Sequence, residues 1–235
     1  MNPEDAQRRI TAYWDERAPE YDRHQQRGQR LEADRTVWRA LWEQTLPAAP
    51  VDVLDLGTGS GYVALLLARL GHRVTGTDLS TGMLEIARRR AREQDLPVRF
   101  EVGDAAAPQV LDGGVDVVVS RYLLWTLRRP GEALRAWRRA LRPGGLLAVV
   151  DGLWFPHGIE ANPTPGFREH YDDGVREALP LAEASRIEEL TGLIRAAGFR
   201  DVRVRALDEL WELDRATGVV PGHDLVRQHL ITARA

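Results

Sequence analysis

A glycine-rich turn between an apolar run and a helical segment constrains the fold of this 235-residue chain more than any other feature. The stretch VDVLDLGTGSGYVALLLARLG places Asp55, Gly57, Gly59 and Gly61 in a D-x-G-x-G-x-G pattern directly after a predicted strand. Glycine lets the chain turn sharply and lets backbone amides approach a ligand closely. The dinucleotide fingerprint G-x-G-x-x-G requires glycine where this chain has Tyr62, and a P-loop requires lysine, which the chain lacks. The loop therefore indicates a ligand site of another kind, with a ligand-free tight turn as the alternative.

Short β-branched runs alternate with helical segments along the rest of the chain. The runs are VDVLDL, RVTGTDL, VRFEVGD, VDVVVS and LLAVVDG, followed near the end of the chain by DVRVRAL and HLITARA. Their near-continuous apolar character is typical of strands buried on both faces. Apolar residues recur with a helical period between Val63 and Gly71, and again behind a predicted N-cap at Ser80. This alternation predicts an α/β fold with a parallel, doubly wound sheet.

Two segments depart from this alternation. Residues 1–50 are rich in Arg and Glu with interspersed Trp, Tyr and Leu, and predict two or three amphipathic helices that end at LPAAP. Residues 152–182 carry four prolines among several aromatic residues, which are uncommon in linkers and predict an inserted lid. We therefore expect an N-terminal helical cap at 1–50 and a core domain at 51–235 that contains the lid.

The composition excludes several classes of protein. All 32 basic residues are Arg, and the formal net charge of -3 provides no basic field for nucleic acid. The absence of Lys and Cys removes Schiff-base lysines, thiol nucleophiles, disulfides and cysteine-ligated zinc. The N-terminal segment lacks the apolar region of a signal peptide, and no apolar stretch approaches about 18 residues. These features predict a cytoplasmic protein without a membrane span.

Acidic residues end two further predicted strands. Asp78 ends RVTGTDL, at the place where doubly wound folds carry an acid that binds a ribose. Asp104 ends VRFEVGD and supplies a second acceptor along the same sheet edge. Each acid alone is also consistent with a surface residue or a helix N-cap. Together with the glycine loop, however, they mark three successive strand ends and predict a site for a ligand that contains a nucleoside.

The combination of these motifs resembles the class I S-adenosylmethionine-dependent methyltransferases, and among them the small-molecule group that includes the ubiquinone and menaquinone biosynthesis methyltransferases. The resemblance covers about residues 10–235 and rests on VLDLGTGSGYVALLLA, VTGTDLSTGML, FEVGDAAAP, VDVVVSRYLLWTL, LRPGGLLAVVDG and AGFRDVRV. It implies a Rossmann-like, seven-stranded sheet that is mostly parallel with one antiparallel strand. It also implies S-adenosylmethionine as the cofactor and a small molecule as the methyl acceptor.

The resemblance further implies a cofactor site at the strand ends. The glycine loop would pack against the methionine part, Asp78 would hold the ribose hydroxyls, and Leu79 and Met83 would wall the adenine. The implied cofactor-binding residues are Tyr21, Asp55, Gly57, Thr58, Gly59, Gly61, Asp78, Leu79, Met83, Asp104, Ala105, Ser120 and Arg121. Tyr21 lies in YWDERAPEYD, which matches the family's early aromatic residue followed by A-x-x-Y-D. The alternative for Tyr21 is that it only anchors the N-terminal helices.

The acceptor site is expected beneath the lid. The candidate catalytic residues are His157, His170 and Tyr171, with packing of the lid as the alternative for each. The candidate acceptor-binding residues are the aromatic side chains Tyr13, Trp125, Trp154 and Phe155. Such side chains suit a planar acceptor, although aromatic residues are also common in cores. The six histidines form no H-x-x-x-H pair, so no metal site is expected.

The sequence therefore predicts an enzyme that transfers a methyl group from S-adenosylmethionine to a small aromatic or heterocyclic metabolite, through C, N or O, in specialised metabolism. The alternatives are a non-catalytic protein that binds the cofactor and a nicotinamide-dependent oxidoreductase. Tyr62 and the absence of a Tyr-x-x-x-Lys dyad disfavour the oxidoreductase, and the acidic balance disfavours a nucleic-acid methyltransferase. The acceptor and the oligomeric state stay open, with a homodimer among the options.

Overall fold

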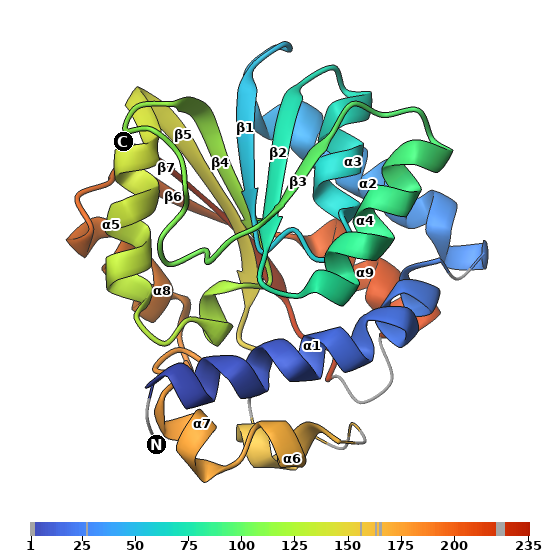
Figure 1. The fold of residues 1–235 in the computed structure, drawn as a ribbon, viewed down its shortest axis with the longest axis vertical. Helices are drawn as coiled ribbons and strands as arrows, with labels where there is room; N and C mark the ends of the chain where they lie inside the picture. Colours follow the sequence, from blue (N-terminus) through green and yellow to red (C-terminus); the bar gives the residue numbers. More distant parts are fainter. Residues whose placement is uncertain (1–2, 27, 156, 163, 165, 220–223) are drawn as a thin grey trace.

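A seven-stranded sheet forms the centre of the molecule (Figure 1). The computed structural model describes residues 3–26, 28–155, 157–162, 164, 166–219 and 224–235. The strands are β1 (Asp52–Leu56), β2 (Arg73–Asp78), β3 (Arg99–Val102), β4 (Val115–Arg121), β5 (Leu141–Gly152), β6 (Arg200–Ala206) and β7 (Gln228–Arg234). Their order is β3-β2-β1-β4-β5-β7-β6, and β7 runs antiparallel to both of its neighbours while the other pairs are parallel. This arrangement confirms the predicted fold class.

Helices cover both faces of the sheet (Figure 1). One face carries α2 (Gly28–Thr45), α3 (Tyr62–Arg69), α4 (Thr81–Glu93) and α9 (Asp208–Thr217), and the other carries α5 (Pro130–Ala140) and α8 (Ile187–Ala196). The apolar residues of β4 contribute to the hydrophobic cores on both faces of the sheet. Val117 and Val119 pack against the first helical layer, and Val118 packs against the second. Burial on both faces explains why the strands read as continuous apolar runs.

The N-terminal helices occupy two different positions. α1 (Pro3–Gln25) lies across the carboxyl ends of the central strands, whereas α2 packs within the helical layer on the sheet (Figure 1). Trp38, Leu41 and Trp42 of α2 are buried in the same apolar cluster as β1 and β4. α1 therefore covers the edge where the glycine loop lies, and α2 supports that edge from the side.

The segment predicted as a lid contains two short helices, α6 (Phe167–His170) and α7 (Asp173–Glu177), and a 3-10 turn, η2 (Ile159–Ala161). Both helices lie on the side of α1 that faces away from the sheet (Figure 1). Phe167 and Tyr171 contact Tyr13 of α1 edge to face, with ring centroids 5.5 and 5.2 Å from it. Pro156 and the pair Pro163 and Pro165 lie outside the described residues.

Local chemistry sets the helix ends near the site. Ser80 caps α4, because its Oγ accepts a hydrogen bond from the Met83 backbone N–H at 3.1 Å, as the sequence predicts. α3 ends before Gly71, whose φ of +90° only glycine adopts readily. The sequence did not predict α9, although its buried residues Leu210 and Asp214 lie four apart on one helical face.

Candidate active site

The glycine loop joins β1 to α3 with all three glycines at positive φ: Gly57 at +67°, Gly59 at +54° and Gly61 at +79°. A side chain at Gly57 would meet Leu123 at 2.8 Å, and one at Gly61 would meet Ala87 and Phe100 at 3.0 Å. Those two glycines therefore allow close packing beneath the loop. Gly59 differs, because a Cβ there would have no atom within 4 Å. Its open side faces a cavity, so apart from the positive φ, the missing side chain at Gly59 matters only for what enters that cavity.

Asp78 at the end of β2 is tied to the loop. Its Oδ2 accepts a hydrogen bond from the Gly59 backbone N–H at 2.8 Å, and its Oδ1 accepts one from the Ser80 N–H at 2.9 Å. Burial raises the pKa of Asp78, while these backbone donors counteract the increase. Each oxygen keeps a lone pair that can accept from a ligand hydroxyl. The carboxylate thus fixes the loop and presents acceptors to the cavity.

Asp15 of α1 binds the first turn of α4, next to Asp78. Its Oδ1 accepts hydrogen bonds from the Ser80 hydroxyl at 2.6 Å and from the Gly82 backbone N–H at 2.9 Å. A carboxylate at the first turn of α4 is favourable because that helix end carries partial positive charge. The contact pins α1 over the strand ends, so α1 becomes a wall of the cavity.

The loop after β3 forms the next wall. Asp104 Oδ1 accepts a hydrogen bond from the Ala106 N–H at 2.8 Å, and the Ala105 carbonyl accepts one from the Trp137 indole at 2.6 Å. Leu79 and Met83 line the cavity beside them. A flat apolar slot with carboxylate and backbone polar groups at its edge is suited to a heteroaromatic ring.

Arg121, at the end of β4, lies among aromatic rings. Its guanidinium carbon is 5.1 Å from the ring centroid of Trp38, 4.8 Å from that of Tyr62 and 4.4 Å from that of Tyr122. These distances permit cation–π attraction. Within the part of the chain that the structure describes, no carboxylate lies within ion-pair distance of this guanidinium. A buried cation that lines a cavity without a carboxylate partner favours an anionic ligand group there.

A single cavity of about 360 Å³ connects these features. At one end it is lined by Gly57, Gly59, Asp78, Leu79, Met83, Asp104, Ala105, Tyr21 and Arg121. Around it stand the aromatic side chains Trp125, Trp154 and Phe155 together with His157. The cavity therefore combines the predicted nucleoside-binding edge with the predicted aromatic walls.

Comparison with known proteins identifies the family. Residues 54–149 match the family model described as a methyltransferase domain. A demethylmenaquinone methyltransferase of Deinococcus radiodurans is 30% identical over 194 residues, which cover 75% of this chain and 79% of that enzyme. The chain belongs to the class I S-adenosylmethionine-dependent methyltransferases. The resemblance found in the sequence is thereby confirmed, and S-adenosylmethionine is the cofactor of this methyltransferase.

Two further comparisons extend this result. A demethylmenaquinone methyltransferase of Thermus thermophilus is 38% identical over 121 residues, which span 51% of this chain and 55% of that enzyme. The geranyl diphosphate C-methyltransferase of Streptomyces coelicolor, solved with S-adenosyl-L-homocysteine, superposes with a TM-score of 0.65. It is 19% identical, and the match covers 88% of this chain and 80% of that one. This structural likeness shows a shared fold.

Four of the predicted cofactor residues of the methyltransferase lie under the loop rather than in the cavity lining: Asp55, Thr58, Gly61 and Ser120. Thr58 Oγ1 donates a hydrogen bond to Asp55 Oδ2 at 2.7 Å, and the Thr58 N–H donates one to the Thr77 carbonyl at 3.0 Å. These contacts stabilise the turn from within and from beneath. The cofactor-binding roles of the four residues stay predictions, because the sequence pattern does not separate support of the turn from contact with a ligand.

Three residues predicted for the acceptor side also lie outside the cavity lining: Tyr13 of α1, His170 and Tyr171. Tyr171 stacks on Phe167 with ring centroids 4.4 Å apart, and Tyr13 packs edge to face against both. His170 Nε2 lies 3.5 Å from Glu16 of α1. These contacts agree with the packing alternative, and the catalytic or acceptor-binding roles of the three residues stay predictions. His157, Trp125, Trp154 and Phe155 do line the cavity.

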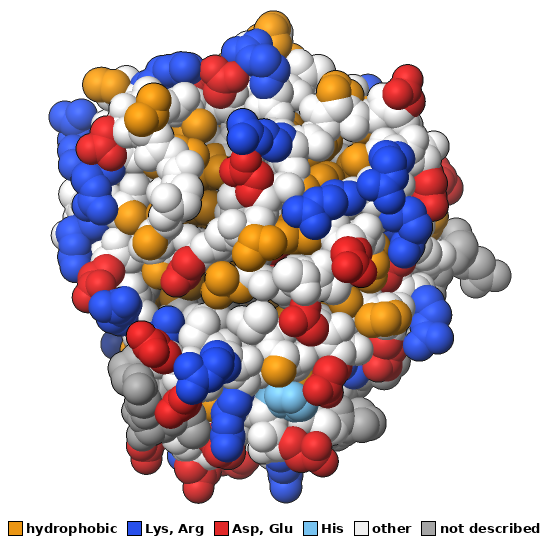
Figure 2. Space-filling model, in the orientation of Figure 1, with side chains coloured by type: hydrophobic (Ala, Val, Ile, Leu, Met, Phe, Trp, Pro, Cys, Tyr) orange, Lys and Arg blue, Asp and Glu red, His pale blue; other side chains and the backbone are white. Residues whose placement is uncertain are grey.

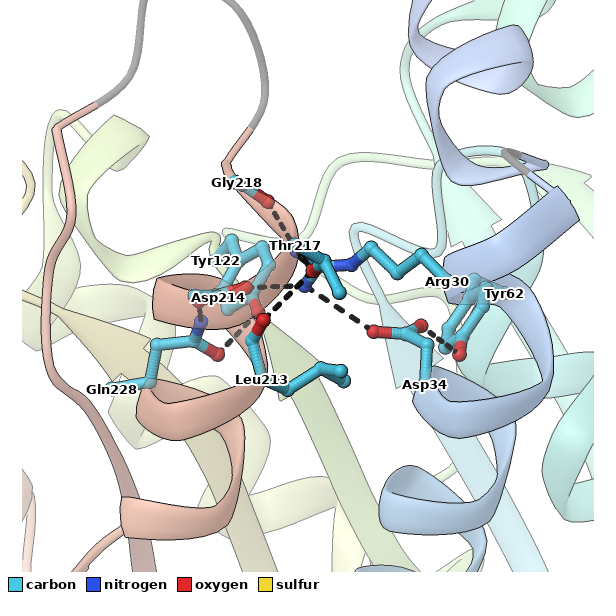
Figure 3. Close-up of polar contacts among 9 residues, drawn as sticks. All are labelled: Arg30, Asp34, Tyr62, Tyr122, Leu213, Asp214, Thr217, Gly218 and Gln228. Atoms are coloured by element: carbon cyan, nitrogen blue, oxygen red, sulfur yellow. Dashed lines mark hydrogen bonds and ion pairs between the residues drawn. The ribbon is translucent and has the colours of Figure 1, made fainter.

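The sequence missed a polar cluster at the other end of the cavity, formed by Arg30, Asp34, Tyr62, Tyr122, Asp214 and Gln228 (Figure 3). It also missed Asp151, a buried acid at the end of β5. Asp151 accepts hydrogen bonds from the Leu124 N–H at 2.9 Å and from the Trp154 indole at 2.5 Å. Its place in VVDG, at a strand end like Asp78 and Asp104, is a signal that could have revealed it.

The described part of the methyltransferase contains neither a metal-binding cluster nor a membrane-spanning helix. No group of three His, Cys, Asp or Glu side chains is placed to hold a metal ion there. None of the described helices is long and apolar enough to cross a bilayer. Arg side chains and acidic side chains both occur across the face shown in Figure 2.

Asp55 gives the methyltransferase a testable pH dependence. Burial raises the pKa of Asp55 from 3.8 to about 7, partly offset by the hydrogen bond from Thr58. The folded state therefore holds a proton that the unfolded chain releases, so stability decreases as pH rises and levels off above the folded-state pKa. We expect the free energy of unfolding to fall by about 1.4 kcal/mol per pH unit between about pH 5 and pH 7, relative to Asp55→Asn.

Denaturant unfolding of both proteins across that pH range measures the difference. The Asn variant keeps an oxygen for Thr58 but has no proton to lose. Parallel curves for the two proteins would show that Asp55 does not titrate in this range.

Proposed function

We propose that this methyltransferase holds S-adenosylmethionine over Gly59 and transfers its methyl group to a small aromatic or heterocyclic metabolite, in specialised metabolism. One observation carries the proposal: the open space above Gly59 belongs to a cavity whose walls also include Trp125, Trp154 and Phe155. Donor and acceptor sites are thus continuous, as a direct transfer requires.

Three groups along the strand ends suit the three parts of the cofactor. Asp78 offers carboxylate oxygens to a ribose diol, and Leu79 and Met83 offer an apolar wall to the adenine. Arg121, which lines the cavity between the loop and the aromatic walls, offers its charge to the methionine carboxylate. Tyr21 lines the same space and interacts electrostatically with Arg121, which supports its predicted place over the amino-acid end.

The bound cofactor supplies an electrophilic methyl group on a sulfonium. The residues of the chain then have to align the acceptor with that methyl and keep water out. α1 and the walls at Trp125, Trp154 and Phe155 exclude water from above and from the side. Asp151 positions two of these walls, since it holds the Trp154 indole and the backbone that leads into Trp125.

The role of Arg121 can be tested without an acceptor. We expect Arg121→Met to bind S-adenosylmethionine about tenfold more weakly, because a charge-assisted pair is lost. 5′-Methylthioadenosine lacks the amino-acid end, so its affinity should change less than about twofold. Calorimetric titration measures both, with Arg99→Met as a control that removes an exposed arginine on β3. Equal losses for the two ligands would place Arg121 away from the carboxylate.

The function itself is tested with labelled S-adenosylmethionine and panels of phenols, aromatic amines, indoles and non-aromatic alcohols. Transfer of label to an aromatic compound supports the proposal, and the labelled atom then identifies the C-, N- or O-acceptor. Transfer only to a non-aromatic compound would contradict the aromatic assignment. Cofactor binding without transfer to any panel would favour the non-catalytic alternative.

Other expectations from the sequence stay predictions. These are the cytoplasmic location, the absence of a nucleic-acid partner and a homodimeric state. The same holds for the boundaries of the helical cap and for His157 as a catalytic residue, although His157 does line the cavity.

A further inference from the structure

A ring of polar side chains closes the cavity at the end away from Leu79 and Met83. We call it the polar ring, and its members are Arg30, Asp34, Tyr62, Tyr122, Asp214 and Gln228 (Figure 3). They come from α2, α3, the loop after β4, α9 and β7, so segments far apart in sequence meet there. Every member lines the same cavity as the glycine loop.

Hydrogen bonds and ion pairs connect the ring from end to end. Tyr62 donates its hydroxyl proton to Asp34 Oδ2, and Arg30 bridges Asp34, at 3.5 Å, and Asp214. Gln228 Nε2 donates to Asp214 Oδ2 at 3.0 Å, and Tyr122 donates to Gln228 Oε1. Burial raises the pKa of both tyrosines, and Asp34 raises that of Tyr62 further. Both phenols therefore stay protonated as donors.

The two carboxylates of the ring differ in what they can still accept. Both oxygens of Asp214 are taken, by Arg30 and Gln228, and its side chain is 6% exposed. Asp34 gives one oxygen to Tyr62, whereas its Oδ1 has only a long contact to Arg30. Its side chain is 15% exposed, and it lines the cavity. Both carboxylates therefore keep lone pairs, but Asp34 is the more exposed of the two and its Oδ1 has only a long contact, so a ligand donor reaches Asp34 more readily.

Flat apolar surfaces surround Asp34. Trp38 follows it by one helical turn on α2, and Leu210 of α9 lines the cavity opposite. Trp154 packs edge to face on Tyr122 with ring centroids 4.7 Å apart. Tyr122 itself has a φ of +62°, which is rare for a bulky residue and marks a backbone held in place by its surroundings. The polar ring is thus a well-ordered group of polar side chains beside the aromatic walls of the cavity.

We propose that the polar ring recognises the methyl acceptor, with Asp34 accepting a hydrogen bond from an O–H or N–H group on an aromatic acceptor that enters the cavity. This inference rests on the proposed function and narrows it, because the acceptor then carries a donor group. According to this inference, the residues that select the acceptor by its polar group belong to the helical layer of α2 and α9, and not to the segment predicted as a lid.

Three isosteric probes test the inference: 4-methylphenol, 4-methylaniline and 1,4-dimethylbenzene. They differ only in the group that can donate, and ligand-observed NMR titration gives their affinities for the protein saturated with S-adenosylhomocysteine. We expect the phenol and the aniline to bind about tenfold more tightly than the hydrocarbon, as for a hydrogen bond to a carboxylate. Asp34→Asn should remove most of that preference and leave the affinity for 1,4-dimethylbenzene unchanged.

Two matched variants complete the experiment. Glu32→Gln changes an exposed acid on the same helix and should keep the preference. Glu169→Gln changes an exposed acid of α6, outside the cavity lining, and should also keep it. A preference that survives in Asp34→Asn would overturn the inference, and so would equal binding, or absent binding, of all three probes to the wild type.

The outcome separates this inference from the proposed function. Failure of the wild type to bind S-adenosylhomocysteine would refute the cofactor site itself. Normal binding of S-adenosylhomocysteine without discrimination among the probes would refute only the role of the polar ring. If Asp34→Asn does not fold, equal binding of the three probes to the wild type would still overturn the inference.

Discussion

Gly59→Val should fold and yet bind S-adenosylmethionine at least about a hundredfold more weakly than the wild type. A Cβ added at Gly59 meets no protein atom within 4 Å, and the side chain projects into the space proposed for the cofactor. Valine at a φ of +54° also strains the backbone, at a cost of about 1–3 kcal/mol in stability. The loss of binding exceeds what strain alone explains, because the ligand and the new side chain compete for one volume.

A matched glycine separates the two effects. Gly144 has a φ of +75° and also has no atom within 4 Å of an added Cβ, but it does not line the cavity. Gly144→Val should therefore lose similar stability and keep its affinity for the cofactor. Thermal melting and calorimetric titration of both variants provide the comparison. Normal binding by a folded Gly59→Val protein would reduce the loop to a structural turn.

Asp78→Ala should weaken S-adenosylmethionine binding about ten- to a hundredfold, or about 1.5–3 kcal/mol. Two effects combine in this loss. The carboxylate no longer accepts from the ribose hydroxyls, and the Gly59 N–H loses its partner at 2.8 Å, so the loop itself is less well held. Calorimetric titration measures the total effect, with Asp112→Ala as a control at an exposed acid.

Nucleoside probes separate the two contributions at Asp78. The wild type should prefer adenosine over 2′,3′-dideoxyadenosine, and Asp78→Ala should bind both alike if the carboxylate contacts the ribose. A preference that survives the substitution would leave Asp78 only the structural role of holding Gly59 and Ser80.

The parts of the site that the sequence predicts are those whose residues follow strands. Asp78 and Asp104 end successive parallel strands, and parallel strands carry their carboxyl ends to one edge. The chain therefore brings these acids and Gly59 together through the sheet alone. The N-cap at Ser80 is predictable for a related reason, since capping depends on residues within one helical turn.

The polar ring shows why the rest could not be predicted. Its members lie between positions 30 and 228 on four elements and the loop after β4, and no local spacing connects them. Their meeting depends on how α2 and α9 pack, and α9 itself was not predicted. The aromatic residues show a second difficulty. Nothing in the sequence around Tyr171 and Trp125 indicates that Tyr171 packs against α1 while Trp125 lines the cavity. The composition of the segment predicts that aromatic side chains line a cavity, but it does not predict which of these side chains face the cavity and which pack against other residues.

Asp151 gives the acceptor side a fixed frame. One buried carboxylate holds the end of β5, the Trp154 indole and the start of the turn that carries Trp125. These anchors are a carboxylate, one indole and backbone groups, so they do not depend on the side chains that follow Phe155. Substitutions beyond that point can reshape the pocket while the cofactor edge keeps its geometry. A chain built in this way can change what it methylates by small steps, without passing through forms that no longer bind the methyl donor.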